Sequence, residues 1–285
     1  MGQKRLSKEQ EIQLVEEYRQ GATVMSLMAK YGFASKKSIV DKVKKYYPDS
    51  YKDIIETAKN NRKGYSFSFE KITSEFDAYF LGLLLTDGYI SRGKDIGIDL
   101  ADEDCIAFLA KTIGKDYKAY EPSSGNVNIQ GKKQRYRLIL SDVKLVLDIA
   151  RLGVIPNKSA VLSGPKLLPE EIKFLPYIIR GIIDGDGCVF ATSYGAPAFY
   201  IITKSKEFSE WLVDVLTNYM YMLDIRSTLT ETGLYRIETA KQSNILKLIT
   251  LAYDKPFGMS RKYKNLRKMF RDYNSDFLLD DRKIV

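Results

Sequence analysis

The stretch IIRGIIDGDGCV, residues 178–189, ends an apolar, helix-like run in two aspartates, Asp184 and Asp186, that alternate with glycines. The C-terminus of a helix carries partial negative charge, so a carboxylate there costs about 0.3–1 kcal/mol. A second stretch, YFLGLLLTDGYI at residues 79–90, has the same form: apolar residues around a glycine, then an aspartate before another glycine. Both aspartates therefore need a purpose that offsets this cost.

The two stretches belong to a longer repeat. Asp87 and Asp186 are 99 positions apart, and so are Tyr136 and Tyr235, which open the segments YRLILSD and YRIETAK. Two unrelated landmarks at one offset indicate a duplicated unit of about a hundred residues. Because only two copies exist, we expect pseudo-two-fold symmetry rather than a solenoid.

Each half of the repeat presents the same series of predicted elements. The acidic helix is followed by strand-like segments, an amphipathic helix, further strands and a closing helix. This series predicts an α+β fold in which helices cover an antiparallel, curved sheet. We expect one repeat at residues 65–168 and the other at residues 169–285.

The glycines inside the two acidic helices explain how the aspartates could meet. Gly82 and Gly181 each cost up to about 1 kcal/mol relative to alanine, and close backbone approach is the usual compensation. Two helices packed this closely would bring Asp87 and Asp186 together at their C-terminal ends. Such a concentrated negative site suits a divalent cation, Mg²⁺ or Mn²⁺. A single Asp-Gly pair would be an ordinary turn, but two at matched positions favour a shared site.

Composition narrows the chemistry. The chain of 285 residues contains no histidine, which excludes a Ser-His-Asp triad and histidine metal ligands. Cys105 and Cys188 are too few for a disulfide framework. Apolar runs are shorter than the ~18–20 residues that a membrane span needs, and the N-terminus lacks the apolar core of a signal peptide. We therefore expect no membrane partner and a cytoplasmic location.

The net charge of +9 is concentrated near the ends of the chain. Residues 1–64 hold 14 lysines and arginines against 8 acidic residues, and residues 255–271 hold 7 basic residues and no acid. This distribution favours a polyanion as partner, and nucleic acid in particular. Solvated helix faces are the alternative explanation.

The N-terminal segment, residues 1–64, is predicted to be a small all-α domain with a linker at residues 60–64. Residues 11–46 contain three short helical patterns, and the last two are separated by a turn at Gly32. A basic third helix after such a turn is typical of a helix-turn-helix that binds DNA. The alternatives are a plain three-helix bundle and a protein-docking module. The predicted DNA-facing residues are Ser35, Lys36, Lys37, Ser38 and Lys42.

The motif segments FLGLLLTDG (80–88) and IRGIIDGDG (179–187) resemble the nine-residue motif of the LAGLIDADG homing endonucleases, over residues ~70–285. The resemblance implies two αββαββα repeats in one chain, a DNA-binding saddle, and sheets that line the major groove. It also implies that Asp87 and Asp186 bind Mg²⁺ with help from the carbonyl groups of Thr86 and Gly185. A monomer would cut both strands of a long, asymmetric target in double-stranded DNA.

The family also places a basic residue near the site, at the end of the last strand of a repeat. Lys241 occupies that place in the second repeat, whereas the first repeat has Asp142. The first motif also has Leu85 where the second has Asp184. We therefore expect catalysis by Asp87, Asp186 and Lys241 in two half-sites that cut at unequal rates.

Further contacts follow from strand alternation and charge. A polar pocket residue after the early strand is expected among Thr203, Lys204, Asp99 and Asp102. Groove-facing strand residues are predicted at Lys133, Arg135, Arg137, Arg236 and Glu238. Phosphate contacts are predicted at Lys255, Arg261, Lys262, Lys264 and Lys268.

These observations favour a site-specific DNA endonuclease. The alternative is a non-cleaving protein on the same scaffold, either a DNA-binding regulator or an intron RNA maturase. Both Asp87 and Asp186 are present, and a pure binder has no need of that acidic pair. A purely structural protein is disfavoured by the distribution of charge.

Overall fold

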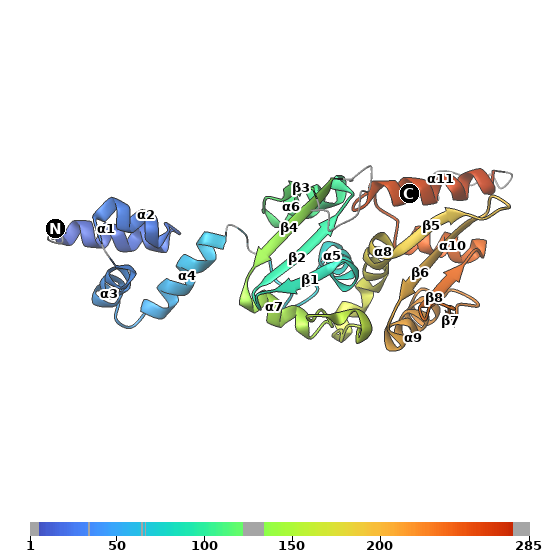
Figure 1. The fold of residues 1–285 in the computed structure, drawn as a ribbon, viewed down its shortest axis with the longest axis horizontal. Helices are drawn as coiled ribbons and strands as arrows, with labels where there is room; N and C mark the ends of the chain where they lie inside the picture. The colour runs from blue at the N-terminus through green and yellow to red at the C-terminus, as the bar shows by residue number, and fades with distance from the viewer. Residues whose placement is uncertain (1–5, 34, 64, 66, 122–133, 276–285) are drawn as a thin grey trace. The chain divides into compact units, whose positions relative to one another are not determined.

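A computed structural model gives the fold of the chain (Figure 1). It describes residues 6–33, 35–63, 65, 67–121 and 134–275. The chain divides into two compact units. The first consists of Met1–Phe67 and Ile113–Lys115, and the second of Ser68–Thr112 and Asp116–Val285. No helix among the described residues is long and apolar enough to cross a bilayer.

The first unit is helical in its described part. Its helices are α1 (Lys8–Arg19), α2 (Val24–Tyr31), α3 (Lys36–Tyr46) and α4 (Tyr51–Lys63). Gly32 ends α2 in the left-handed conformation with φ 74°, which glycine adopts without strain. The helices enclose a buried cluster that includes Leu14, Leu27, Ile39 and Val43. Residues 60–63 of the predicted linker belong to α4, and the first unit passes to the second between residues 67 and 68.

The second unit mixes helices and antiparallel sheets, as predicted, and runs twice through the order αββαββα. The first run is α5 (Glu75–Thr86), β1 (Gly88–Ser91), β2 (Asp95–Leu100), α6 (Glu103–Ile113), β3 (Lys118–Tyr120), β4 (Arg135–Ser141) and α7 (Val143–Ala150). The second is α8 (Leu175–Gly185), β5 (Gly187–Ala191), β6 (Pro197–Thr203), α9 (Lys206–Asp214), β7 (Ser227–Leu229), β8 (Tyr235–Thr239) and α10 (Gln242–Leu251), followed by α11 (Ser260–Tyr273). The sheets have the matching strand orders β1-β2-β4-β3 and β5-β6-β8-β7. The predicted division at residue 168 falls inside this one unit.

Helices α5 and α8 pack side by side between the two sheets (Figure 1). A Cβ added to Gly82 would stand 2.2 Å from the carbonyl oxygen of Ile178 and 2.9 Å from the Cα of Gly181. A Cβ on Gly181 would stand 2.2 Å from the carbonyl oxygen of Tyr79. The close backbone approach predicted from the two glycines is therefore confirmed, and the helices run parallel.

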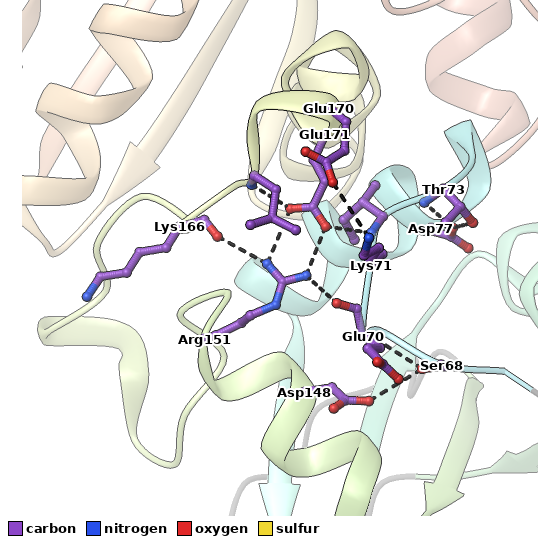
Figure 2. Close-up of polar contacts among 12 residues, drawn as sticks. Ser68, Glu70, Lys71, Thr73, Asp77, Asp148, Arg151, Lys166, Glu170 and Glu171 are labelled. Atoms are coloured by element: carbon purple, nitrogen blue, oxygen red, sulfur yellow. Dashed lines mark hydrogen bonds and ion pairs between the residues drawn. The ribbon is translucent and has the colours of Figure 1, made fainter.

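A buried carboxylate joins the segments that lead into these two helices (Figure 2). Glu171 is fully buried and accepts hydrogen bonds from the amides of Ile72 (2.7 Å) and Leu168 (2.8 Å). Arg151 donates to the same carboxylate at 2.8 Å and also to the carbonyl oxygen of Glu70. A buried charge is tolerated only when it is paired and hydrogen-bonded. Glu171 thus fixes the starts of α5 and α8, as the glycines fix their middles.

Candidate active site at the ends of the motif helices

The C-terminal ends of α5 and α8 meet. Asp87 and Asp186 are the residues that end these helices, and their amides donate to Leu83 (2.9 Å) and Ile182 (3.0 Å). A Cβ on Gly185 would lie 2.0 Å from the Thr86 hydroxyl and 2.7 Å from an Asp87 carboxylate oxygen. A side chain at position 185 would displace the side chains of Thr86 and Asp87, so the Asp87 carboxylate lies against the backbone just before Asp186.

Among the described residues, the two carboxylates have no partner of opposite charge in contact. In the part of the chain that the structure describes, neither accepts a hydrogen bond nor forms an ion pair. Burial, and then the charge of Asp186, raises the pKa of Asp87 to about 6. Asp186 keeps an exposed side, but the surrounding protein atoms raise its pKa as well. A bound cation would relieve both penalties.

Two buried lysines hold the helix ends, and sequence reasoning missed this role for both. Lys158, which was not singled out, donates to the carbonyl oxygens of Thr86 (3.1 Å) and Gly88. Lys262, predicted as a phosphate contact, donates to the backbone carbonyl oxygens of Ile183, Asp184 and Gly187, each at 2.7 Å. A cation at a helix C-terminus offsets the macrodipole. Burial lowers the pKa of both lysines, while the charges of nearby aspartates raise it.

These contacts change two expectations. The ammonium group of Lys262 lies inside the protein, where it cannot act as the surface phosphate contact that was predicted. The Thr86 carbonyl, a predicted metal ligand, already accepts from Lys158 and has one lone pair left. The sequence marks these two lysines only by their position, because each comes after the last helix of an αββαββα run.

The donor set fits Mg²⁺. No three His, Cys, Asp or Glu side chains gather anywhere in the described chain, so a metal here would have two carboxylates as its charged ligands. Mg²⁺ is usually held by one or two carboxylates together with substrate phosphates and water. The unpaired state of Asp87 and Asp186 and the raised pKa of each agree with such a site.

A cavity of about 290 Å³ opens beside Asp186. Its polar lining comes from Thr86, Ser159, Thr203, Lys204 and Asp186, and its apolar lining from Leu85, Leu162, Ile202, Phe208 and Leu234. Thr203 and Lys204, the candidates for the polar residue of the second repeat, both line this cavity.

The first repeat differs. Asp99 pairs with Arg137, and Asp102 pairs with Arg261 at 3.1 Å, so neither is left as the polar residue that was expected there. The positive charge of Arg135 partly opposes the rise in the pKa of Asp87. The position 99 residues later is the apolar Leu234.

Lys241 lies at the wrong end of its sheet for catalysis. Gly187, next to Asp186, pairs with Ile201, and Ile201 pairs with Ile237. Thr239 pairs with Phe199, and Lys241 lies two residues beyond Thr239. Lys241 is therefore about 13 Å along the chain from Ile237. It is exposed and ion-paired with Asp224 at 2.8 Å.

Asp142, the counterpart of Lys241, is equally remote. It caps α7 by accepting from the amide of Lys144 at 2.9 Å, at the Asp95–Ser141 end of the first sheet. The contrast between Lys241 and Asp142 therefore gives no support to unequal cutting of the two strands.

Asp184 belongs to the core. It accepts hydrogen bonds from the hydroxyls of Tyr79 (2.8 Å) and Tyr253 (2.7 Å), and burial raises its pKa. The fully buried Arg180 stacks on Phe257, with its guanidinium carbon 3.9 Å from the ring centroid. This cluster links α5, α8 and the segment before α11. It explains the first aspartate of the DGDG stretch as a structural residue.

The predicted DNA-contacting residues divide into available and engaged groups. In the first unit, Ser35 caps α3 through its hydroxyl, Lys36 and Lys37 are exposed, and Ser38 is partly exposed. Lys42 instead forms an ion pair with the buried Glu11, which lowers the pKa of Glu11 to about 2.

In the second unit, Lys264 and Lys268 are exposed, whereas Arg261 pairs with Asp102 and Lys255 pairs with Glu75 at 2.5 Å. Lys133 lies outside the described residues. Arg135, Arg137, Arg236 and Glu238 stand on the faces of the sheets opposite the buried Leu138 and Ile237.

No protein-family model matches the chain, and no curated protein matches it. Solved structures match distantly. Full-length DUF199/WhiA from Thermatoga maritima has 12% identity and a TM-score of 0.43 over 72% of this chain; the match covers 64% of WhiA, less than two thirds of that protein.

Two further structures are the LAGLIDADG meganuclease I-AabMI bound to uncleaved DNA and the LAGLIDADG homing endonuclease I-LtrWI bound to target DNA. The first has 12% identity and a TM-score of 0.43 over 74% of this chain and 98% of that chain. The second has 11% identity and a TM-score of 0.45 over 74% and 95%.

Proposed function

We propose that this protein is a site-specific endonuclease that hydrolyses phosphodiester bonds of double-stranded DNA with Mg²⁺ or Mn²⁺ held by Asp87 and Asp186. The observation that carries the proposal is the meeting of two unpaired carboxylates at the ends of glycine-packed helices. A metal bound there would activate water and stabilise charge on the phosphate. The motif resemblance in residues 80–88 and 179–187 supports the same activity.

The chain's own residues would prepare the site. Lys158 and Lys262 hold the carbonyl groups around both aspartates in fixed positions. Lys204 and Ser159 line the cavity beside Asp186 and can donate to phosphate oxygens. The two αββαββα runs would act as two half-sites about an internal two-fold axis. A monomer would then bind a long, asymmetric target.

The test is incubation of the full chain with a randomised duplex library. We expect double-strand cuts at a restricted set of sequences with Mg²⁺ and none with EDTA. Selective binding without any cut under either condition would favour the alternative, a non-cleaving DNA-binding regulator on this scaffold. Absence of both cutting and duplex binding would contradict the proposal.

The first unit is proposed to be a helix-turn-helix that extends the DNA contact. Lys36 and Lys37, exposed in the first turn of α3, would meet phosphates. The double variant K36A/K37A should lower the slope of log affinity against log salt by about 1.8, because each lost phosphate contact removes about 0.9. Lys44, exposed near the other end of α3, provides the matched control variant K44A, for which we expect the parent slope. An unchanged slope in K36A/K37A would assign the unit another role.

A further inference from the structure

The open face of the first sheet holds an arginine in a fixed orientation. Along β4, Leu138 and Leu140 are buried, whereas Arg137 and Ile139 stand on the opposite face, where 37% of each remains exposed. Arg137 lies directly across from Asp99 in β2 and donates Nε to Oδ1 and Nη2 to Oδ2, both at 2.7 Å. This side-on pairing leaves the two terminal nitrogens as a fork on the far side of the guanidinium group.

Further contacts keep this arginine in place. The Tyr120 hydroxyl donates to Asp99 at 2.8 Å, and the Arg137 guanidinium carbon lies 4.3 Å from the centroid of the Tyr120 ring. Arg135 donates to the Asp99 carbonyl oxygen at 2.8 Å. Ordering a long side chain on binding costs about 0.5–1.5 kcal/mol, and here folding has already met that cost.

The second sheet contains a looser version of the same arrangement. Arg236, 99 positions after Arg137, lies 4.3 Å from the centroid of the Tyr200 ring and donates Nε to Glu238 at 2.8 Å. Nη2 of Arg236 pairs at 2.6 Å with Oε2 of Glu238, which is the same oxygen that Nε contacts. The guanidinium group therefore reaches only one carboxylate oxygen. The Glu238 side chain is 52% exposed against 19% for Asp99. Arg137 is therefore held more rigidly than Arg236.

We propose that Arg137, oriented by Asp99, reads a guanine in the DNA groove that faces the first sheet, and that Arg236 makes a weaker contact of the same kind. The free fork of an arginine matches the O6 and N7 acceptors of guanine in the major groove. An arginine that only neutralises phosphate gains nothing from a carboxylate beside it, because Asp99 cancels its charge. Selection of a base through a fixed fork is the use that this geometry favours. The inference rests on the proposed binding of duplex DNA.

The variant R137K separates base reading from phosphate binding. Lysine keeps the charge but lacks the planar fork. Sites are selected from a randomised duplex library in EDTA by the full-length parent, R137K, D99N and R236K. R137K should lose about 5- to 150-fold in preference for guanine at one position, with an unchanged salt slope. R236K should show a smaller loss at a different position.

D99N gives a signature that damage to the fold cannot produce. It should lower guanine preference about 2- to 13-fold through loss of orientation, while binding to non-specific duplex becomes tighter because a negative charge has gone. R137K selecting the same guanine as the parent would overturn the inference and leave the proposed function intact. A parent protein that binds no duplex would overturn both.

Discussion

Replacing Asp87 by asparagine is expected to abolish Mg²⁺-dependent cleavage of both strands, while the chain still folds and binds duplex DNA. Asparagine keeps the shape of the side chain but removes the charge that would hold the metal. The carboxylate makes no hydrogen bond within the described residues, so the substitution leaves no buried donor without its acceptor. We expect a loss on the order of 10³-fold or more in the cleavage rate on end-labelled duplex. Asp186→Asn should behave alike.

Stability gives this variant a second readout that does not depend on activity. A carboxyl group whose pKa is raised from 3.8 to about 6 destabilises the fold when it ionises. That cost appears as pH rises from 3.8 to about 6, and it is then constant at up to about 3 kcal/mol. Without metal, D87N should therefore be more stable than the parent at pH 7.5 and similar to it near pH 4.

Metal binding should depend on the ionised form of the same Asp87 carboxylate. Because Mg²⁺ competes with the proton on Asp87, its affinity for the parent should fall by up to tenfold per pH unit below about 6. The rise in melting temperature that Mg²⁺ causes should shrink between pH 7.5 and pH 5, and it should be absent from D87N. Full cleavage by D87N, or equal stabilisation by Mg²⁺ in both proteins, would remove Asp87 from the site.

Features that recur at a fixed spacing were readable in the sequence. The offset of 99 between Asp87 and Asp186 correctly matched the two motif helices, and the glycines inside them predicted their contact. This works because a helix and its buried face are encoded locally, so that two copies of one pattern fold alike. The mixed helical and antiparallel architecture followed from the same repetition.

Features that depend on tertiary position were not readable. Lys241 follows the last strand of its repeat, but the strand register that puts it far from Asp186 is set by pairing with β6. Lys158 reaches the carbonyl of Thr86, a residue 72 positions earlier, and no periodic pattern marks such a contact. The pairing of Asp99 with Arg137 depends likewise on the alignment of β2 and β4. Side-chain partners between elements were the part that sequence reasoning could not supply.

Replacing Gly82 by alanine should damage fold and site together, in contrast to D87N. The added Cβ would stand 2.2 Å from a backbone oxygen of α8, and no side-chain rotation can relieve a clash with backbone. The helices must separate, which we expect to cost about 3 kcal/mol of unfolding free energy, reduced by up to 1 kcal/mol through the better helix propensity of alanine. A shift of about 1 Å between Asp87 and Asp186 should lower cleavage about 100-fold or more.

Gly195 supplies the control that separates general instability from this specific loss. It has φ +80° in a turn with nothing within 4 Å, so G195A should cost about 1 kcal/mol through backbone strain alone. G195A should keep the full rise in melting temperature with Mg²⁺, whereas G82A should lose most of it. The loss of cleavage in G82A should persist at temperatures where both proteins are folded. If G82A were destabilised yet retained both the metal response and cleavage, the glycine contact would serve the fold alone. The two aspartates would then have to be held in register by other contacts, of which the carbonyl groups fixed by Lys158 and Lys262 are the strongest candidates.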